Sequence, residues 1–288
     1  MFAAALVDAG HHVTLAGRTP FTQLEVHHPH GTATSEVTFV DSPNDLQPVP
    51  LVVLATKAYQ VDAAGDLLRA SCDGGTVLAV LQNGIGHADR VRPWVGHDVD
   101  VLATMVACPA DRTSPGRVEV RGSAILEVLG SPGGRRFAQA FDGSFATVRT
   151  VDDIHTSLWR KLLLNAIGGG IGVLARKSNS LFVGDDGALA LARDLAEEVL
   201  AVAQADGAQL DADTVDTLIR GLSGGSTHLP SIVVDRISGQ PTEWQVRNDV
   251  VVRKGVEHGV PVPLCQMLST LIRLGEPSGA TTPGLPRR

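Results

Sequence analysis

Short, mostly apolar runs separated by helix-forming segments make up the first half of the chain. Three of these runs are residues 51–56, 76–81 and 99–106. Strands that are apolar along their length, rather than at alternate positions, are typical of a parallel sheet covered by helices on both faces. β-rich runs at residues 12–16 and 36–40 and a helical segment at 61–70 extend the alternation. The pattern predicts a parallel α/β sheet, with a late hairpin of residues 118–120 and 124–129.

From about residue 153 onward, apolar residues recur at helical spacing instead. The predicted helices are residues 156–167, 186–205, 212–221, 240–258 and 263–274. The predicted fold class is therefore α/β: a Rossmann-like parallel-sheet domain, N-terminally truncated, followed by an all-helical C-terminal domain. We expect the sheet domain at residues 1–150, the helical domain at 151–277 and a flexible tail at 278–288, which is rich in Gly, Pro and Thr.

Charge and cysteine content exclude several classes of protein. The net charge is −7, from 24 Lys and Arg against 31 Asp and Glu, so a uniformly basic nucleic-acid binder is excluded. The three cysteines, Cys72, Cys108 and Cys265, form neither a disulfide framework nor a zinc-ligand spacing. No apolar run reaches the roughly 18 residues of a membrane helix, and no signal peptide is evident. We expect a cytoplasmic protein without a metal, a nucleic-acid partner or a membrane partner.

Polar residues follow three of the predicted strands. They are Gly17-Arg18, Lys57 and Gln82-Asn83-Gly84. Each set alone reads as an ordinary turn, but ligands of open parallel sheets bind at the carboxyl ends of the strands, so the three together favour a ligand site. An arginine in place of an acidic residue after the second strand of a dinucleotide fold suits the extra phosphate of NADP. Arg18 therefore indicates NADPH, the alternative being a solvated surface arginine.

The first strand and the glycine-rich loop of a dinucleotide fold are not found in this sequence. The chain opens on a helix-forming segment, residues 1–9, which ends at Gly10, and no G-x-G-x-x-G precedes it. Restoring the strand and loop would need roughly a dozen residues upstream. We favour a misassigned start codon over a genuine truncation, because every later element is intact. The loop supplies backbone N–H groups to the pyrophosphate, so its loss would weaken cofactor binding.

Several polar residues of the second half are candidates for a site. Lys161 and Asn165 are four apart and share a helix face, where leucines would partly desolvate the lysine and suit it to proton transfer. The alternative for Lys161 is a lysine that extends to the helix surface. Asn179 follows a run of glycines, Gly168-Gly169-Gly170, which either permits a close approach or breaks the helix. The remaining candidates are Ser231, Asp235, Thr242 and Glu243. For Thr242 and Glu243 the alternative is that they cap and start the next helix.

Taken in order, these segments resemble the ketopantoate reductase family (2-dehydropantoate 2-reductases) over almost the whole chain. No single motif is decisive, but their order and spacing are fairly specific. The matching segments are Ala9-Gly10-His11 with Val13-Thr14-Leu15 and Gly17-Arg18, Thr56-Lys57-Ala58-Tyr59-Gln60, Leu81-Gln82-Asn83-Gly84-Ile85-Gly86, Trp159-Arg160-Lys161-Leu162 with Asn165, Ser178-Asn179, Pro230-Ser231 with Asp235, Thr242-Glu243, and Gly255 with His258-Gly259 and Pro263.

The resemblance implies an NADPH-dependent reduction of 2-dehydropantoate (ketopantoate) to pantoate, a step of pantothenate biosynthesis and of the coenzyme A pathway. It makes the first domain NADP-binding and the second the substrate and catalytic domain. The expected ligand is a small 2-keto acid substrate, and a homodimer is a possible assembly. By resemblance, Lys161 is the proton donor and Glu243 the second catalytic residue. The implied cofactor-binding residues are Arg18, Lys57, Asn83 and Glu243, and the implied substrate-binding residues are Asn165, Asn179 and Ser231.

The sequence departs from the family pattern at two further places. Gly169-Gly170 stands where the family usually has Asn-Pro, and that asparagine contacts substrate; Gln245 stands where the family usually has an Asp. The reaction type is therefore better supported than the substrate. The alternatives are a reductase of another ketone or imine, and a non-catalytic relative that has lost the phosphate-binding loop.

Overall fold

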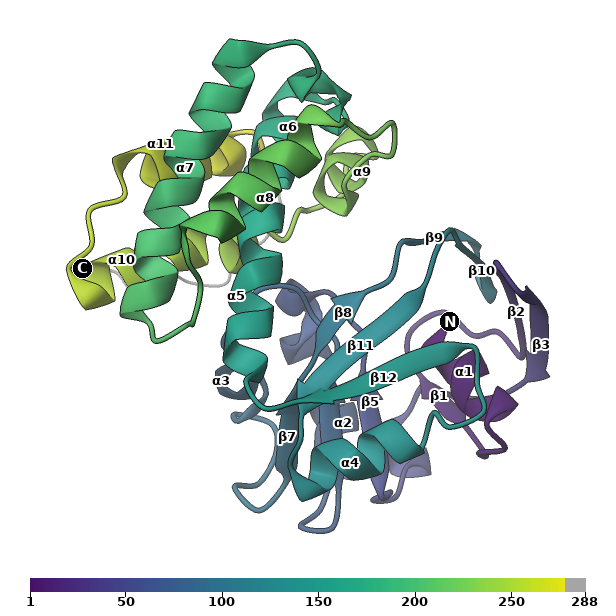
Figure 1. Cartoon of the computed structure of the whole chain (residues 1–288). Coiled ribbons are helices and arrows are strands. Elements are labelled where there is room, and N and C mark those ends of the chain that lie inside the picture. Colours follow the sequence, from purple (N-terminus) through teal and green to yellow (C-terminus); the bar gives the residue numbers. More distant parts are fainter. Residues whose placement is uncertain (278–288) are drawn as a thin grey trace. The chain divides into compact units, whose positions relative to one another are not determined.

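The computed structural model describes residues 1–277, which divide into two compact units (Figure 1). One unit contains Met1–Gln82 and Gly86–Ile154, and the other contains Asn83–Ile85 together with the chain from His155 onward. The first unit holds all the strands and the second is helical, which confirms the predicted fold class. The tail predicted at residues 278–288 lies outside the described residues.

Two parallel sheets form the α/β part of the first unit. One has the order β5-β6-β7 and the other pairs β1 with β4. Their strands are β1 (Thr14–Ala16), β4 (Thr38–Val40), β5 (Leu51–Leu54), β6 (Val77–Val80) and β7 (Asp100–Ala103). All four residues of β6 are buried, because this central strand is covered on both faces by apolar side chains. The fully apolar run in the sequence therefore marks the centre of its sheet.

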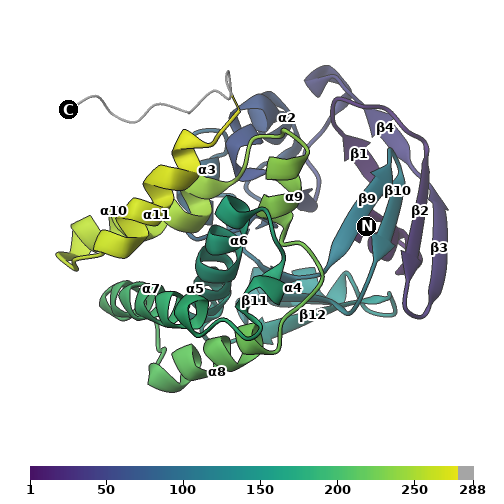
Figure 2. The same cartoon turned by 90° about the horizontal axis from the view of Figure 1, so that it is seen from above.

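Two mixed sheets complete the first unit, and the predicted hairpin of residues 118–129 is wrong. One has the order β3-β2-β10-β9 (Figure 2), and the other has the order β12-β11-β8 (Figure 1). Their strands are β2 (Gln23–His28), β3 (Gly31–Glu36), β8 (Met105–Ala107), β9 (Ala110–Ser114), β10 (Arg117–Val120), β11 (Ala124–Leu129) and β12 (Ala146–Val151). β10 pairs with β2 and β9, whereas β11 pairs with β8 and β12. The two strands thus belong to different sheets.

Short helices connect the strands of the first unit. They are α1 (Phe2–Asp8), α2 (Gly65–Ser71), α3 (His87–Val91), α4 (Pro132–Gln139) and the 3-10 turns η1 (Pro43–Asp45), η2 (Ala58–Gln60) and η3 (Asp62–Ala64). α1 ends as predicted before Gly10, whose φ of +89° favours glycine. Its buried Ala5 and Leu6 join the core beneath β6.

The second unit consists of helices, two of which contain a π-helical stretch. Its elements are α5 (Ile154–Leu164), the π-helix η4 (Asn165–Gly169), α6 (Gly170–Ala175), the 3-10 turn η5 (Asn179–Phe182), α7 (Asp186–Ala205), α8 (Ala212–Ser223), α9 (Ser231–Ile237), the π-helix η6 (Gln245–Asp249), α10 (Val250–His258) and α11 (Pro263–Leu274). The predicted helix 240–258 begins only at Trp244, where η6 follows. The glycine run does not break its helix, because α5, η4 and α6 are continuous to Ala175.

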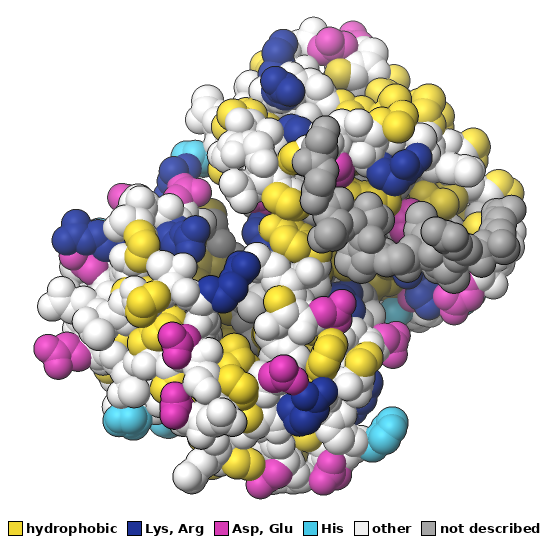
Figure 3. All heavy atoms as spheres, turned by 180° about the vertical axis from the view of Figure 1, so that it is seen from behind, with side chains coloured by type: hydrophobic (Ala, Val, Ile, Leu, Met, Phe, Trp, Pro, Cys, Tyr) yellow, Lys and Arg dark blue, Asp and Glu magenta, His cyan; other side chains and the backbone are white. Residues whose placement is uncertain are grey.

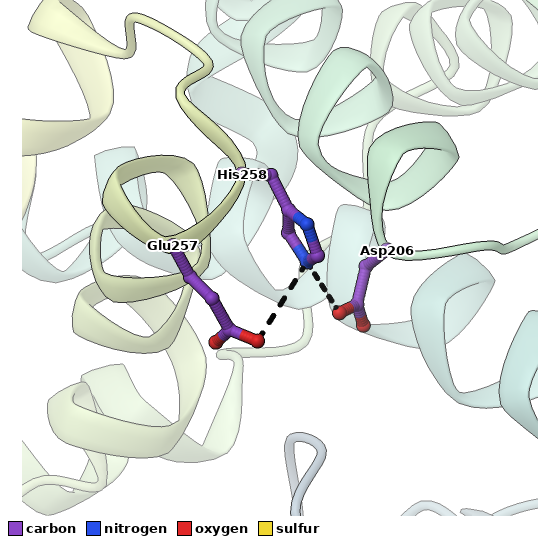
Figure 4. Close-up of side chains that lie close together, drawn as sticks. All are labelled: Asp206, Glu257 and His258. Carbon is purple, nitrogen blue, oxygen red and sulfur yellow. Dashed lines mark hydrogen bonds and ion pairs between the residues drawn. The ribbon is translucent and has the colours of Figure 1, made fainter.

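The acidic side chain of Asp206 joins three helices of the second unit. Figure 4 shows it beside Glu257 and His258. Asp206 follows the last residue of α7, and its carboxylate accepts hydrogen bonds from Trp159 Nε1 at 2.9 Å and His258 Nε2 at 2.8 Å. Lys254 Nζ lies 3.0 Å from Asp206 and 3.0 Å from Glu257, so an ammonium group already pairs with both acids. The cluster therefore links α5, α7 and α10 through hydrogen bonds and salt bridges.

The surface of the molecule carries both signs of charge. Figure 3 shows basic and acidic side chains interspersed over the visible face. Within residues 1–277, none of the helices has the length and apolar character required to cross a bilayer.

Candidate active site

Lys161 and Asn165 lie one helical turn apart on the helix that runs from α5 into η4. Lys161 is half-buried, near the end of α5, and Asn165 is the first residue of η4. The amide nitrogen of Asn165 is buried and has no hydrogen-bond partner in the described chain. A buried donor without an acceptor is costly, so this amide calls for an oxygen from outside the protein. π-helical stretches within α-helices are frequent at functional sites.

Asn179 packs against the same π-helix. A Cβ atom on Gly168 would lie 3.1 Å from Asn179 Oδ1, so the glycine allows the amide to approach the helix closely. Asn179 Oδ1 is buried and accepts no hydrogen bond from residues 1–277. Asn165 and Asn179 therefore offer one unused donor and one unused acceptor, which suits a ligand with both carbonyl and hydroxyl oxygens.

The second π-helix, η6, faces the first. Asn248 Nδ2 donates to the Ala166 carbonyl oxygen at 2.9 Å, and Arg247 Nη1 donates to Ser231 Oγ at 3.0 Å. Glycines make this approach possible, since a Cβ on Gly169 would lie 2.8 Å from Arg247 Nη2. Of these residues only Ser231 was predicted for the site. Arg247 and Asn248 were missed, because each reads from sequence as an ordinary position of a helix.

Glu243 is a buried carboxylate, 3% exposed, two residues before the start of η6. Its Oε2 accepts a hydrogen bond of 2.9 Å from Asn83 Nδ2, so two residues predicted for the cofactor site are brought together. The preceding residue, Thr242, is held by Glu276, whose Oε2 accepts from its backbone N–H at 2.9 Å and whose Oε1 accepts from its hydroxyl at 2.7 Å. Glu276 thus fixes the segment that carries Glu243, and nothing in the sequence pattern pointed to it.

Gly84 positions Asn83. Gly84 has a φ of +84°, and a Cβ atom there would collide with the backbone carbonyl of Val246 in η6. Only glycine meets both conditions, because the left-handed backbone disfavours other residues and the space for a side chain is absent. The segment Asn83–Ile85 therefore belongs to the compact helical unit.

We expect Gly84→Ala to lower the free energy of unfolding by more than about 2 kcal/mol, since the left-handed backbone alone costs about 1–2 kcal/mol for an L-residue and the collision adds to it. Thermal and urea denaturation measure the loss. Gly86→Ala is the matched control, because Gly86 has a φ of +74° and a Cβ there meets nothing closer than 3.9 Å. Equal losses for the two variants would refute the close contact with Val246.

Arg18 and Lys57 lie in the first unit, each just beyond a parallel strand. Arg18 is exposed after β1, and Lys57 is half-buried after β5, where its backbone N–H donates to Gln60 Oε1 at 3.2 Å. Cations at the carboxyl ends of parallel strands fit the phosphates of a dinucleotide. The charge and location of these two residues therefore fit the phosphates of a nicotinamide dinucleotide.

Comparison with known proteins identifies the family. Residues 1–130 match the family described as "Ketopantoate reductase PanE/ApbA", and residues 153–276 match "Ketopantoate reductase PanE/ApbA C terminal". A 2-dehydropantoate 2-reductase of Mycobacterium tuberculosis (strain CDC 1551 / Oshkosh) is 38% identical over 273 residues, which cover 94% of this chain and 92% of the relative. The chain belongs to the ketopantoate reductase family. It is thus an oxidoreductase by family, as the sequence predicted.

Solved structures share the fold of this ketopantoate reductase family member. A 2-dehydropantoate 2-reductase from Geobacter metallireducens GS-15 superposes with a TM-score of 0.88 at 24% identity, covering 95% of each chain. A ketopantoate reductase from Staphylococcus aureus, described as dimeric, gives a TM-score of 0.84 at 22% identity and covers 96% of this chain and 94% of the other. These likenesses confirm the two-part architecture, a parallel-sheet part followed by a helical part.

Proposed function

We propose that the protein catalyses the NADPH-dependent reduction of 2-dehydropantoate to pantoate. The observation that carries the proposal is the pairing, one helical turn apart, of a half-buried Lys161 with a buried, unpartnered amide of Asn165. Membership of the family supports the same reaction. Bound NADPH supplies the hydride that adds to the carbonyl carbon of the substrate.

The residues of this chain account for the rest of the reaction. Lys161 Nζ donates a hydrogen bond to the ketone oxygen, stabilises the negative charge that develops on it and gives it a proton. Asn165 Nδ2 donates to a substrate oxygen, and Asn179 Oδ1 accepts from a substrate hydroxyl. Ser231 Oγ contributes a further polar contact. Glu243, buried against Asn83, orients that amide toward the cofactor.

The proposal is tested by assaying NADPH consumption with 2-dehydropantoate and with other 2-oxo acids, such as 2-oxoisovalerate and pyruvate. We expect the highest kcat/KM with 2-dehydropantoate, because its 4-hydroxyl group can satisfy the amides of Asn165 and Asn179. Equal or faster turnover of another acid would contradict the substrate assignment. Failure to bind NADPH in a fluorescence titration would favour the non-catalytic alternative.

Reduction of a different ketone or imine is the second candidate, and Gly169 favours it. At this position the chain has a glycine where the family pattern has an asparagine, so one amide expected to contact the substrate is missing. The panel of 2-oxo acids therefore needs neutral ketones as well.

We expect Arg18→Ala to reduce the preference for NADPH over NADH by about 10- to 100-fold, because the charged hydrogen bonds of an arginine to a phosphate contribute about 1.5–3 kcal/mol. The ratio of kcat/KM for the two cofactors measures the effect. Arg112→Ala, which removes an exposed arginine of β9, is the control. An unaltered ratio in Arg18→Ala would remove this residue from the phosphate site.

We further propose a homodimer in the cytoplasm. The dimeric description of the Staphylococcus aureus protein supports the assembly. Cys72, Cys108 and Cys265 form no disulfide among residues 1–277, which is consistent with a reducing compartment. Sedimentation of the purified protein tests the dimer.

A further inference from the structure

Arg247 is a buried guanidinium with most of its hydrogen-bonding capacity unused. The residue is 2% exposed. Its guanidinium has five N–H groups, and within residues 1–277 one hydrogen bond uses them, from Nη1 to Ser231 Oγ. Its Nε is buried and has no acceptor among residues 1–277. No carboxylate in that part of the chain forms an ion pair with it. A buried cation without a paired anion is strongly unfavourable, so the position calls for an anionic ligand.

The guanidinium of Arg247 occupies the space that a side chain at position 169 would fill. A Cβ on Gly169 would lie 2.8 Å from Arg247 Nη2 and 3.2 Å from Ile232 Cγ2, so only glycine leaves room for the arginine without a shift. Gly169 is four residues after Asn165, at the other end of η4. Arg247 therefore reaches the same π-helix that carries the unpartnered amide of Asn165.

Ser231 marks the accessible edge of the guanidinium. It is exposed, at the first position of α9, and its hydroxyl is bound to Nη1. A ligand that contacts Ser231 is therefore within reach of the guanidinium fork. Arginine is the residue best suited to a carboxylate, because two of its parallel N–H groups match the two oxygens.

The charges around Arg247 keep it cationic. Burial lowers the pKa of its guanidinium, whereas Glu243 and Asp235 act in the opposite direction. Arginine stays protonated in proteins even when its pKa is lowered. The negative charges of Glu243 and Asp235 partly offset the positive charge of the guanidinium without forming an ion pair with it. The N–H groups other than the one bound to Ser231 therefore remain available to a ligand.

We propose that Arg247 binds the carboxylate of the substrate, with Ser231 as second donor, and so selects 2-oxo acids over neutral ketones. The inference rests on the proposed function for the identity of the acid. A purely structural arginine would only link α9 to η6, and that role needs neither the charge nor the remaining N–H groups. Recognition of a carboxylate makes a different prediction, because its loss affects charged substrates alone.

The experiment compares 2-dehydropantoate with its neutral lactone, 2-dehydropantolactone, in Arg247→Gln, Arg247→Lys and the wild type. We expect Arg247→Gln to lower kcat/KM for the acid about 10- to 100-fold, mainly through KM, the range given by one charged hydrogen-bonded contact. Turnover of the lactone should change less than about threefold. Arg247→Lys keeps the charge but lacks the fork, so its loss should be smaller. Equal losses on acid and lactone would overturn the proposal and indicate a structural role.

Two further measurements keep the proposal testable if the arginine variants do not fold. In the wild type, pantoate should inhibit at least about 10-fold more strongly than its neutral amide, pantoamide, which keeps the 4-hydroxyl group, and equal inhibition would overturn the proposal. Ser231→Ala, at an exposed position, should raise KM for the acid several-fold and raise KM for the lactone by a smaller factor. An equal effect on both would count against it.

Failure of the proposed function is distinguishable from failure of this inference. If another 2-oxo acid is the better substrate, the same comparison is made between that acid and its methyl ester. The assignment of 2-dehydropantoate then falls, while selective loss of the acid in Arg247→Gln still supports Arg247. If the protein neither binds nor reduces any 2-oxo acid, both fall.

Discussion

Replacing Lys161 by alanine is expected to lower kcat for 2-dehydropantoate by about 10²–10⁴-fold, the usual contribution of a positioned general acid. The loss falls on kcat, because the lysine acts on the ketone oxygen as charge develops there. The Kd for NADPH should change less than about threefold. Steady-state kinetics and a fluorescence titration of the cofactor measure the two quantities.

Arg160→Ala is the matched control for Lys161→Ala. Arg160 is the preceding residue of α5, carries the same charge and is exposed. Its replacement should alter kcat less than about twofold. Similar losses in both variants would mean that α5 rather than the lysine is affected, and an unchanged kcat in Lys161→Ala would refute the role of proton donor.

Replacing Asp206 by alanine is expected to lower the free energy of unfolding by about 3 kcal/mol, the cost of breaking a buried charge network. The carboxylate is 8% exposed and bonds to Trp159 on α5 and to Lys254 and His258 on α10. The acid itself follows α7, and a negative charge at that helix end is unfavourable without these partners. Its removal therefore leaves donors of two helices without their acceptor. Urea denaturation at neutral pH measures the loss.

The matched control is Asp216→Ala. Asp216 pairs with Arg193 at 2.7 Å, but both side chains are more than 40% exposed, so its loss should cost less than about 1 kcal/mol. Comparable losses for the two variants would contradict the special role of Asp206.

The effect of Asp206→Ala also depends on pH. Burial raises the pKa of Asp206, but hydrogen bonds from His258, Lys254 and Trp159, together with the charge of Lys254, outweigh it and hold the pKa below its ordinary value. An acid with a lowered pKa stabilises the fold above the ordinary pKa of about 3.9, and the contribution is lost as pH falls through the folded-state pKa. The difference in the free energy of unfolding between the wild type and Asp206→Ala should therefore be largest near neutral pH and become smaller below about pH 4.

Long periodic helices and buried parallel strands could be predicted from the sequence, and non-local pairing could not. The helix at residues 186–205 was predicted to the residue, because its apolar stripe is regular and Asp185 caps it. The error at residues 118–129 has a physical cause. Gly122-Ser123 between two β-rich runs is typical of a turn, yet β10 pairs with β2, about 90 residues earlier in the chain.

The candidate site was predictable only where the family resemblance marked a residue. The structure brings Asn83 to Glu243, both of which had been predicted. Arg247 gave no such signal, since a lone arginine in a helix is usually solvated. Its burial depends on Gly169 and Ser231, which are 78 and 16 residues earlier in the chain.

Because of the π-helix η4, the number of residues in this helix matters to the site independently of which side chains they carry. An α-helix turns about 100° per residue, and η4 changes the phase between α5 and α6. A π-helical turn holds about one residue more than an α-helical turn, so deleting one residue between Asn165 and Gly169 would restore an unbroken α-helix without rotating α6. Gly170 would still face Asn248, against which it packs. The widened turn that begins at Asn165 would be lost, and with it the position of the unpartnered amide, while the packing of the rest of the helix is kept.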